Sequence, residues 1–430
     1  MILQNVKIQN FKILREADVD FKPGMNLLIG INGAGKSTFL QALHILVSWL
    51  IARIASKNGK GRFITNDSIT SRMPDCKLEI TMDNGVSWSL YKQRSTVRVE
   101  TKSKSDLSQL NDFVRNYYEN NSNEDLQLKH VPLFAFYSVD RAVTVTEVPK
   151  YVHHIHHLLP VDIYSKFDDE KINFRDFFEW FREKEDIENE NYRQLSSGRF
   201  RPDRQLKAVR EALSIALPQY SNLRIQRSPR AIMVDKDGDS FKFDQLSDGE
   251  KCYITLIGDI ARKIAMANPD MEQPLDAPGV VIIDEIDLHL HPSWQQTIIS
   301  NLTKAFRNVQ FIVTTHSPFV VSSTEPSVNN QVLTLTDGNI EPSTADDYGA
   351  EVQNVLLNTF RLDTLRNNEV QGHIDHLWRI ISSMDYDEAE ADNEITWLRN
   401  HLSENDKEFL KIKLQMALIK KKEAGHDAHK

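Results

Sequence analysis

The sequence predicts an α/β fold: a mixed sheet with flanking helices, a helical insertion and a helical C-terminal region. Three short apolar segments with helical sequence between them carry this prediction: MNLLI at 25–29, GVVIID at 279–284 and QFIVTT at 310–315. Such uninterrupted runs are typical of strands buried on both faces of a sheet. At 430 residues, the chain is long enough for one large domain with an insertion or for two to three smaller domains.

We expect four parts along the chain. Residues 1–60 form the N-terminal part of an α/β head, and residues 61–245 hold its remaining strands together with a helical insertion at about 145–230. Residues 246–345 form the C-terminal part of the head, and residues 346–430 form a helical interaction region. No internal repeat of fixed period is found, and no low-complexity linker separates the parts.

Local patterns predict the elements within these parts. A helix is expected from about Lys36 to Ser56, after a glycine-rich loop, and another from about Glu250 to Asn268. Alternating apolar residues around Asn84-Gly85 predict a hairpin, and LFAFY at 133–137 predicts a buried strand. The insertion predicts an aromatic amphipathic helix within 165–200 and a second one at about 203–217, and the C-terminal part predicts two long helices.

Composition and charge limit the class of protein. Hydrophobic residues make up 40% and charged residues 26%, the balance of a soluble globular protein. We find neither a secretory leader nor an apolar stretch approaching the length of a membrane helix, so we expect a cytoplasmic protein. Cys76 and Cys252 cannot form a disulfide framework or a four-ligand zinc site. The net charge of −9 argues against nucleic-acid binding through overall charge, although a local basic groove stays open.

The loop after the first apolar strand fits the pattern GxxxxGK[ST]. Its strand-to-helix context favours a phosphate-binding loop over a chance match, because backbone N–H groups and the helix N-terminus can hold phosphates there. Lys36 would reach the β- and γ-phosphates, and Ser37 would bind Mg²⁺. The residues expected to bind a cofactor that carries these phosphates are Asn32, Gly33, Ala34, Gly35, Lys36, Ser37 and Thr38.

Two acids follow the second apolar strand. Asp284 would hold Mg²⁺, and Glu285 would act as general base on the attacking water. The alternative to a catalytic role is a core strand followed by a solvated acidic turn. The phosphate-binding loop upstream favours the catalytic role over this alternative.

A short motif and a histidine complete the candidate site. Leu246-Ser247-Asp248-Gly249-Glu250 precedes a helix and is similar to the signature LSGGQ of ABC-type ATPases, with Asp248 and Glu250 replacing Gly and Gln. Ser247, Asp248 and Gly249 are expected to bind a γ-phosphate of the cofactor, because a hydroxyl, backbone N–H groups and the helix dipole meet there. The alternative is a plain N-cap. His316 follows the third strand and resembles the switch histidine of that class, although a structural histidine is the alternative. Residues 287–292 occupy the D-loop position, and the pair His289/His291 is not assigned a metal.

Together these motifs resemble an ABC-type P-loop ATPase head of the SMC/RecF/OLD-like class. The resemblance implies ATP and Mg²⁺ as cofactors, with Lys36, Glu285 and His316 catalytic. It also implies a homo-oligomer, a dimer or higher, because the signature of one head completes the ATP site of another. No Gln stands at an obvious Q-loop position, where Asp140-Arg141 could substitute, and Lys12 could either approach a phosphate or lie on the surface.

Outer segments extend the resemblance. YSVDR at 137–141, FFEWFREKED at 177–186 and the segment 360–381 are similar to ATPases of Septu anti-phage systems (PtuA-like) and retron-associated relatives. That family implies an ATPase, of fast or slow turnover, that recruits or gates a separate small effector nuclease of HNH type. The acids at 383–408 favour a solvated helical surface over a metal site, so we expect no nuclease activity in this chain.

A different function is direct DNA binding by a RecF-like repair ATPase. Two basic groups could contact phosphates of DNA or RNA, although solvated faces are the commoner explanation. They are Lys92, Arg94, Arg98, Lys102 and Lys104, and Arg199, Arg201, Arg204, Lys207 and Arg210. A third function is a scaffold that binds ATP and barely hydrolyses it.

Overall fold

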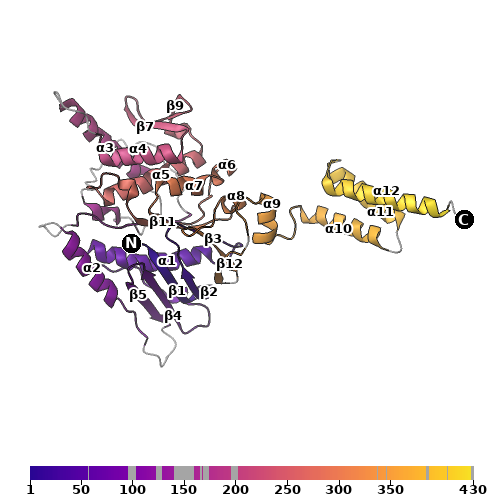
Figure 1. The fold of residues 1–430 in the computed structure, drawn as a ribbon, viewed down its shortest axis with the longest axis horizontal. Helices are drawn as coiled ribbons and strands as arrows, with labels where there is room; N and C mark the ends of the chain where they lie inside the picture. Colours follow the sequence, from indigo (N-terminus) through magenta and orange to yellow (C-terminus); the bar gives the residue numbers. More distant parts are fainter. Residues whose placement is uncertain are drawn as a thin grey trace. The chain divides into compact units, whose positions relative to one another are not determined.

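The computed structural model forms two compact units, 1–352 and 353–430, which we describe separately. It describes residues 1–56, 58–94, 103–122, 128–139, 159–164, 167, 174–194, 202–336, 338–344, 346–383, 387–403 and 405–427. Figure 1 shows both units along the chain.

A six-stranded mixed sheet forms the centre of unit 1. Its order is β13 (Asn339–Pro342), β12 (Gln331–Thr336), β3 (Met25–Ile29), β11 (Val309–Thr314), β10 (Gly279–Ile283) and β6 (Leu133–Tyr137). The five strands from β12 to β6 pair in parallel, and β13 pairs with β12 antiparallel. The strands β3, β6, β10 and β11 are buried throughout. The predicted mixed sheet and its apolar strands are thereby confirmed.

A second, antiparallel sheet packs beneath the first helix. Its order is β2 (Leu14–Asp20), β1 (Leu3–Phe11), β4 (Asp75–Met82) and β5 (Ser87–Gln93). The predicted hairpin at Asn84-Gly85 joins β4 to β5, with Thr81 opposite Ser87 and Gly85 at φ 80°. The last part of the predicted alternation, at 97–100, lies outside the described residues.

Helix α1 (Lys36–Ala55) contacts β6 of one sheet and β1 and β4 of the other. The indole N–H of Trp88, on β5, donates to the carbonyl of Leu46 at 3.0 Å and ties this helix to the antiparallel sheet. By length and composition α1 could cross a membrane, which we did not anticipate, yet 67% of its apolar window is buried inside the protein. Burial on both sides accounts for its unusual apolarity.

The other face of the central sheet carries a helical layer, with α5 and α4 on the side of β11 away from α1 (Figure 1). The main helices of this layer are α3 (Phe174–Gln194), α4 (Arg204–Ala216), α5 (Asp248–Ala267) and α7 (Ile298–Ala305). Shorter elements of unit 1 are α2 (Ser108–Asn121), α6 (Pro292–Gln295), α8 (Pro318–Ser322) and the 3₁₀ turns Asn66–Ser68, Pro160–Tyr164, Phe243–Gln245 and Pro274–Asp276. The helices predicted near 165–200, 203–217 and 250–268 are confirmed.

A three-stranded antiparallel sheet adjoins this layer and was not predicted. It consists of β7 (Tyr220–Arg227), β8 (Arg230–Lys236) and β9 (Asp239–Lys242). Its buried side chains alternate along two strands: Leu223 and Ile225 on β7, and Ile232 and Val234 on β8. That period of two was the available signal, which we overlooked beside the helical patterns of the insertion.

Unit 2 is a helical hairpin with a third helix. It contains α10 (Asn368–Ser382), α11 (Glu388–His401) and α12 (Lys407–Asp427), after α9 (Val352–Asn354) and a π-helical turn at Val355–Thr359. Its core is built mainly from Leu377, Leu398, Phe409 and Ile412. Three long helices therefore replace the two expected, because the turns after Ser382 and His401 each end a helix.

Candidate functional site

Strand order brings the predicted motifs to one edge of the central sheet. The neighbouring parallel strands β3, β11 and β10 end at the same edge, and each is followed by one motif. The glycine-rich loop follows β3, Asp284-Glu285 follows β10, and His316 comes two residues after β11. Ligand sites in such sheets lie outside the carboxyl ends of the strands.

The glycine-rich loop leads into α1 with its backbone partly left-handed. Gly33 has φ 79° and Gly35, the N-cap of α1, has φ 112°. A Cβ at Gly35 would lie 2.8 Å from Cγ2 of Ile13. Among the described residues, no side chain caps the helix and no acid lies in its first turn, so its positive end is available to an anion. The predicted cofactor residues around it lie exposed (Asn32, Gly33, Ser37), half-buried (Gly35, Thr38) or buried (Ala34, Lys36).

The side chain of Lys36 folds back over the loop. It is 5% exposed, and its ammonium donates to the carbonyls of Gly30 at 2.8 Å and Ile31 at 3.3 Å. Burial lowers the pKa of Lys36, while the carboxylates of Asp284, Glu285 and Asp287 act in the opposite direction. The lysine thus lies within electrostatic reach of the acids that follow β10.

One hydroxyl contacts both acids after β10. Thr314 Oγ1, at the end of β11, donates to Asp284 Oδ1 at 2.5 Å and accepts the backbone N–H of Glu285 at 2.7 Å. Asp284 is 5% exposed, whereas Glu285 is half-buried with a left-handed φ of 49°. Sequence reasoning missed Thr314, although pairing of the strands β10 and β11 places it beside the acids.

His316 is half-buried and joins the same group of charges. Burial and the charge of Lys36 lower its pKa, against the opposing effect of Glu285, Asp287 and Asp284. A lowered pKa favours the neutral imidazole at pH 7, which can donate one hydrogen bond and accept another. The structure therefore brings Lys36, Asp284, Glu285 and His316 together.

The oxygen atoms near this edge suit Mg²⁺, which prefers hydroxyl, carboxylate and phosphate ligands. The predicted ligands Ser37 and Asp284 supply a hydroxyl and a carboxylate from elements that meet at the same edge. Within the described ranges, no group of three or more His, Cys, Asp or Glu side chains could hold a metal alone. A divalent ion here would share its ligands with a bound phosphate. Asp140-Arg141, the suggested Q-loop substitute, lies outside the described residues.

The signature-like motif forms the start of α5. Ser247 caps the helix, with its hydroxyl accepting the N–H of Glu250 at 3.3 Å and its own N–H donating to Glu250 Oε2 at 2.6 Å. Ser247 and Asp248 are exposed. A Cβ at Gly249 would lie 2.3 Å from the carbonyl oxygen of His289, so this motif and the D-loop segment lie against each other.

Several residues considered for phosphate or nucleic-acid contacts have partners within the fold. The ammonium of Lys12 donates to Gln41 Oε1 at 2.5 Å. The guanidinium of Arg94 donates to the carbonyls of Met73, Ile69 and Thr70, and that of Arg210 donates to Glu188. Arg98, Lys102, Arg199 and Arg201 lie outside the described residues.

Comparisons with known proteins identify a family and several relatives. A sequence model of the family described as "AAA domain, putative AbiEii toxin, Type IV TA system" matches residues 25–322. Retron Ec83 probable ATPase of Escherichia coli is 28% identical over 96% of this chain and 86% of that protein. Retron Vc95 probable ATPase of Vibrio cholerae serotype O1 biovar El Tor is 31% identical over 75% of this chain and 71% of that protein.

Two further similarities are more distant. Septu protein PtuA of Bacillus thuringiensis is 24% identical over 83% of this chain and 80% of that protein. Among solved structures, the SMC head domain from Thermotoga maritima aligns with a TM-score of 0.42 and 15% identity, covering 80% of this chain and 100% of that chain.

Proposed function

Because this chain belongs to the family of AAA domains described as putative AbiEii toxins of type IV toxin–antitoxin systems, we propose that it is the ATP-binding and ATP-hydrolysing subunit of a bacterial anti-phage defence complex. The resemblance to ATPases of the Septu and retron kind, stated from the motifs and the outer segments, is confirmed by its relatives. Two relatives are named as probable retron ATPases and one as a Septu protein. Their names support a role in defence.

One observation carries the proposal of ATP hydrolysis: Lys36, Asp284, Glu285 and His316 meet beside the open N-terminus of α1. The ammonium of Lys36 would exchange the carbonyls of Gly30 and Ile31 for phosphate oxygens. Mg²⁺ held at Ser37 and Asp284 would neutralise charge on the phosphates. Glu285 would take the proton of the attacking water, and His316 would donate to the γ-phosphate.

The second half of the site would come from another copy of the chain. Ser247 and Asp248 are exposed, and the contacts of Ser247, Asp248 and Gly249 run to Glu250, Lys251 and His289 rather than to the loop at 30–37. We therefore propose a head-to-head ATP sandwich in a homo-oligomer, a dimer or higher, in the cytoplasm. A separate small effector nuclease, of HNH type by family resemblance, would be recruited or gated by the nucleotide state.

The alternative of direct DNA binding has less support from the described residues. Arg94 and Arg210, one from each basic group, hold carbonyl or carboxylate oxygens inside the fold. Such side chains would have to give up these bonds before they could contact a phosphate backbone.

Glu285→Gln tests the proposal. We expect this variant to bind ATP·Mg²⁺ but to hydrolyse it at least about a hundredfold more slowly, since general-base catalysis typically contributes that factor. The ATP-bound oligomer should therefore accumulate, as a mass measurement in solution with and without ATP·Mg²⁺ would show. Glu341→Gln, a matched change at an exposed acid on β13, should behave as wild type. Hydrolysis by Glu285→Gln at the wild-type rate would disprove the role of Glu285.

A further inference from the structure

A buried carboxylate lies directly beneath the exposed Ser247. Glu250, in the first turn of α5, is 8% exposed and accepts the ammonium of Lys236 at 2.6 Å and the N–H of Ser247 at 2.6 Å. The hydroxyl of Tyr220 donates to the same carboxylate. Lys236 comes from β8 and Tyr220 from β7, so the three-stranded sheet contributes two of the donors. Neither residue was singled out from the sequence.

This carboxylate creates an electrostatic conflict for a phosphate at the start of α5. The positive end of a helix attracts a phosphate, but acids in its first turn oppose one. The signature that this motif resembles has the neutral residues Gly and Gln where this chain has Asp248 and Glu250. This chain therefore has two additional negative charges at the start of α5, Asp248 exposed and Glu250 buried, where the γ-phosphate is proposed to bind.

Two lysines balance these charges. Lys236 contacts Glu250 at 2.6 Å, and Lys251 lies 3.4 Å from Oδ1 of Asp248. Burial alone would raise the pKa of Glu250, but hydrogen bonds from Lys236, Tyr220 and Ser247 lower it to about 2. The carboxylate thus stays ionised at neutral pH and depends on a cation for compensation.

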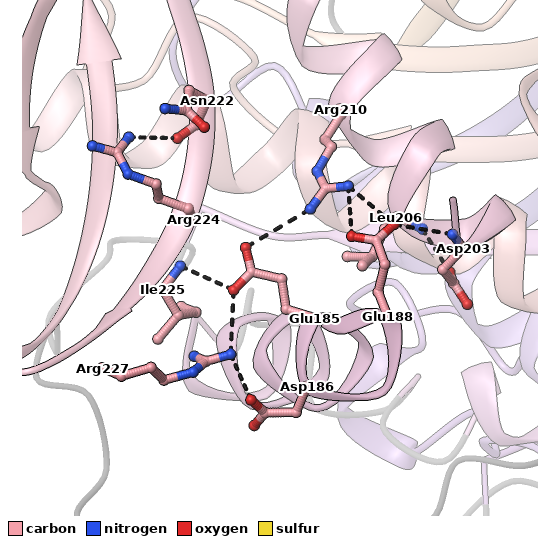
Figure 2. Close-up of polar contacts among 10 residues, drawn as sticks. All are labelled: Glu185, Asp186, Glu188, Asp203, Leu206, Arg210, Asn222, Arg224, Ile225 and Arg227. Atoms are coloured by element: carbon pink, nitrogen blue, oxygen red, sulfur yellow. Dashed lines mark hydrogen bonds and ion pairs between the residues drawn. The ribbon is translucent and has the colours of Figure 1, made fainter. Parts of the chain in front are cut away.

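The sheet that carries Lys236 is joined to the helical layer through Glu185, a buried carboxylate whose arginine partners are partly exposed (Figure 2). Glu185, on α3, accepts the backbone N–H of Ile225 on β7 at 3.2 Å and the guanidinium of Arg227 at 3.5 Å. Arg210, on α4, lies 3.8 Å from Glu185 and donates to Glu188 at 3.0 Å. With β7 held in this way and paired to β8, Lys236 has a defined place beside α5.

We propose that Lys236 is a positioning residue of the signature: by compensating the charge of Glu250, it allows the α5 N-terminus and Ser247 to receive the γ-phosphate of an ATP molecule bound to another head. The proposal rests on the proposed ATP sandwich. Lys236 acts through Glu250 and need not touch the nucleotide itself.

A purely structural contact between Lys236 and Glu250 predicts a different pattern of variants. If the pair only joined the sheet to α5, Glu250→Gln would be as harmful as Lys236→Met, and combining them would restore nothing. If charge compensation matters, Glu250→Gln should be tolerated, because it removes the negative charge that Lys236 has to balance. The double variant Lys236→Met/Glu250→Gln should then recover what Lys236→Met loses.

The test compares these three full-length variants with wild type in ATP-dependent association and in ATP hydrolysis. We expect Lys236→Met to weaken both by about tenfold or more, and the double variant to return to within a few-fold of wild type. Lys242→Met, in the exposed part of β9, is the matched control and should behave as wild type.

The outcomes separate the inference from the function on which it rests. If wild type neither associates with ATP nor hydrolyses it, the proposed ATP sandwich fails. If wild type does both but Lys236→Met matches it, or the double variant shows no recovery, the role of Lys236 is overturned. Should Lys236→Met fail to fold, Glu250→Gln alone decides: near-normal activity supports charge compensation, and a loss as large as that expected for Lys236→Met overturns it.

Discussion

Thr314 offers a direct test of how the acids after β10 are held. Thr314→Val replaces the hydroxyl by a methyl group of similar size at a position with no exposed surface. The change removes the donor to Asp284 Oδ1 and the acceptor of the Glu285 N–H. The hydrophobic volume is nearly kept, so the loss of these two hydrogen bonds should dominate the result.

The expected magnitude follows from the two bonds. A hydrogen bond to a charged group contributes about 1.5–3 kcal/mol and a neutral one about 1 kcal/mol, so unit 1 should lose about 2–4 kcal/mol of unfolding free energy. Glu285 has a left-handed φ of 49°, which the bond to Thr314 helps to maintain. Without it, the carboxylate should leave its position, and ATP hydrolysis should fall about tenfold to a hundredfold, as misplacement of a catalytic group does.

Two measurements check this prediction: the thermal unfolding midpoint of the whole chain and its rate of ATP hydrolysis. Thr314→Ser keeps the hydroxyl and loses only a methyl group, so it should unfold somewhat earlier but hydrolyse ATP at nearly the wild-type rate. If Thr314→Val hydrolyses ATP as fast as Thr314→Ser, the hydroxyl does not position Glu285 and the reasoning is refuted.

Two predictions concern unit 2. Burial raises the pKa of Glu394, but hydrogen bonds from His373 and His376 outweigh it and hold this pKa below its usual 4.5. The ionised carboxylate therefore stabilises unit 2 above pH 4.5, and this stabilisation is lost as the pH falls below 4.5. Glu394→Gln should therefore lose less stability than wild type between about pH 5 and pH 3, as tryptophan fluorescence during urea unfolding would show. Equal losses of the two proteins over this range would contradict the pairing. Asp406 accepts hydrogen bonds from two nitrogens of Arg366, at 2.8 and 3.0 Å, and caps α12. Asp406→Ala should therefore lower the free energy of unfolding by about 1–3 kcal/mol in the same assay, and Asp406→Asn should lower it less because asparagine can still cap the helix. Identical unfolding of Asp406→Ala and wild type would argue against both contacts.

The sequence predicted those parts of the fold in which one physical pattern dominates. The strands β3, β10 and β11 are buried on both faces, so their residues are apolar without interruption, and glycines with left-handed φ mark the loop after β3. The resemblance to ABC-type ATPases implied that the three motifs form one site, and the strand order of the structure brings them to one edge. The apolarity of α1 was underestimated, because a helix between two sheets needs no polar face.

The parts that were missed depend on contacts between residues distant in sequence. Thr314 matters only because β11 pairs with β10, and a threonine at a strand end carries no sign of this. Lys236 reaches Glu250 through a sheet whose alternating pattern is short and polar on its outer face. In unit 2, Asp387 caps α11 and Glu388 begins it, so the acids after Ser382 mark the start of a helix; the third long helix, which was not expected, follows the turn after His401.

Gly249 changes how variation in the signature-like motif should be understood among relatives of this protein. In the proposed ATP sandwich, a glycine at this place would let the backbone come close to the nucleotide. Here the carbonyl oxygen of His289 lies 2.3 Å from where a Cβ would stand, within the same chain and without any nucleotide. Selection on this position can therefore act on the spacing between two loops, and a lineage that lost ATP binding would still be expected to retain the glycine.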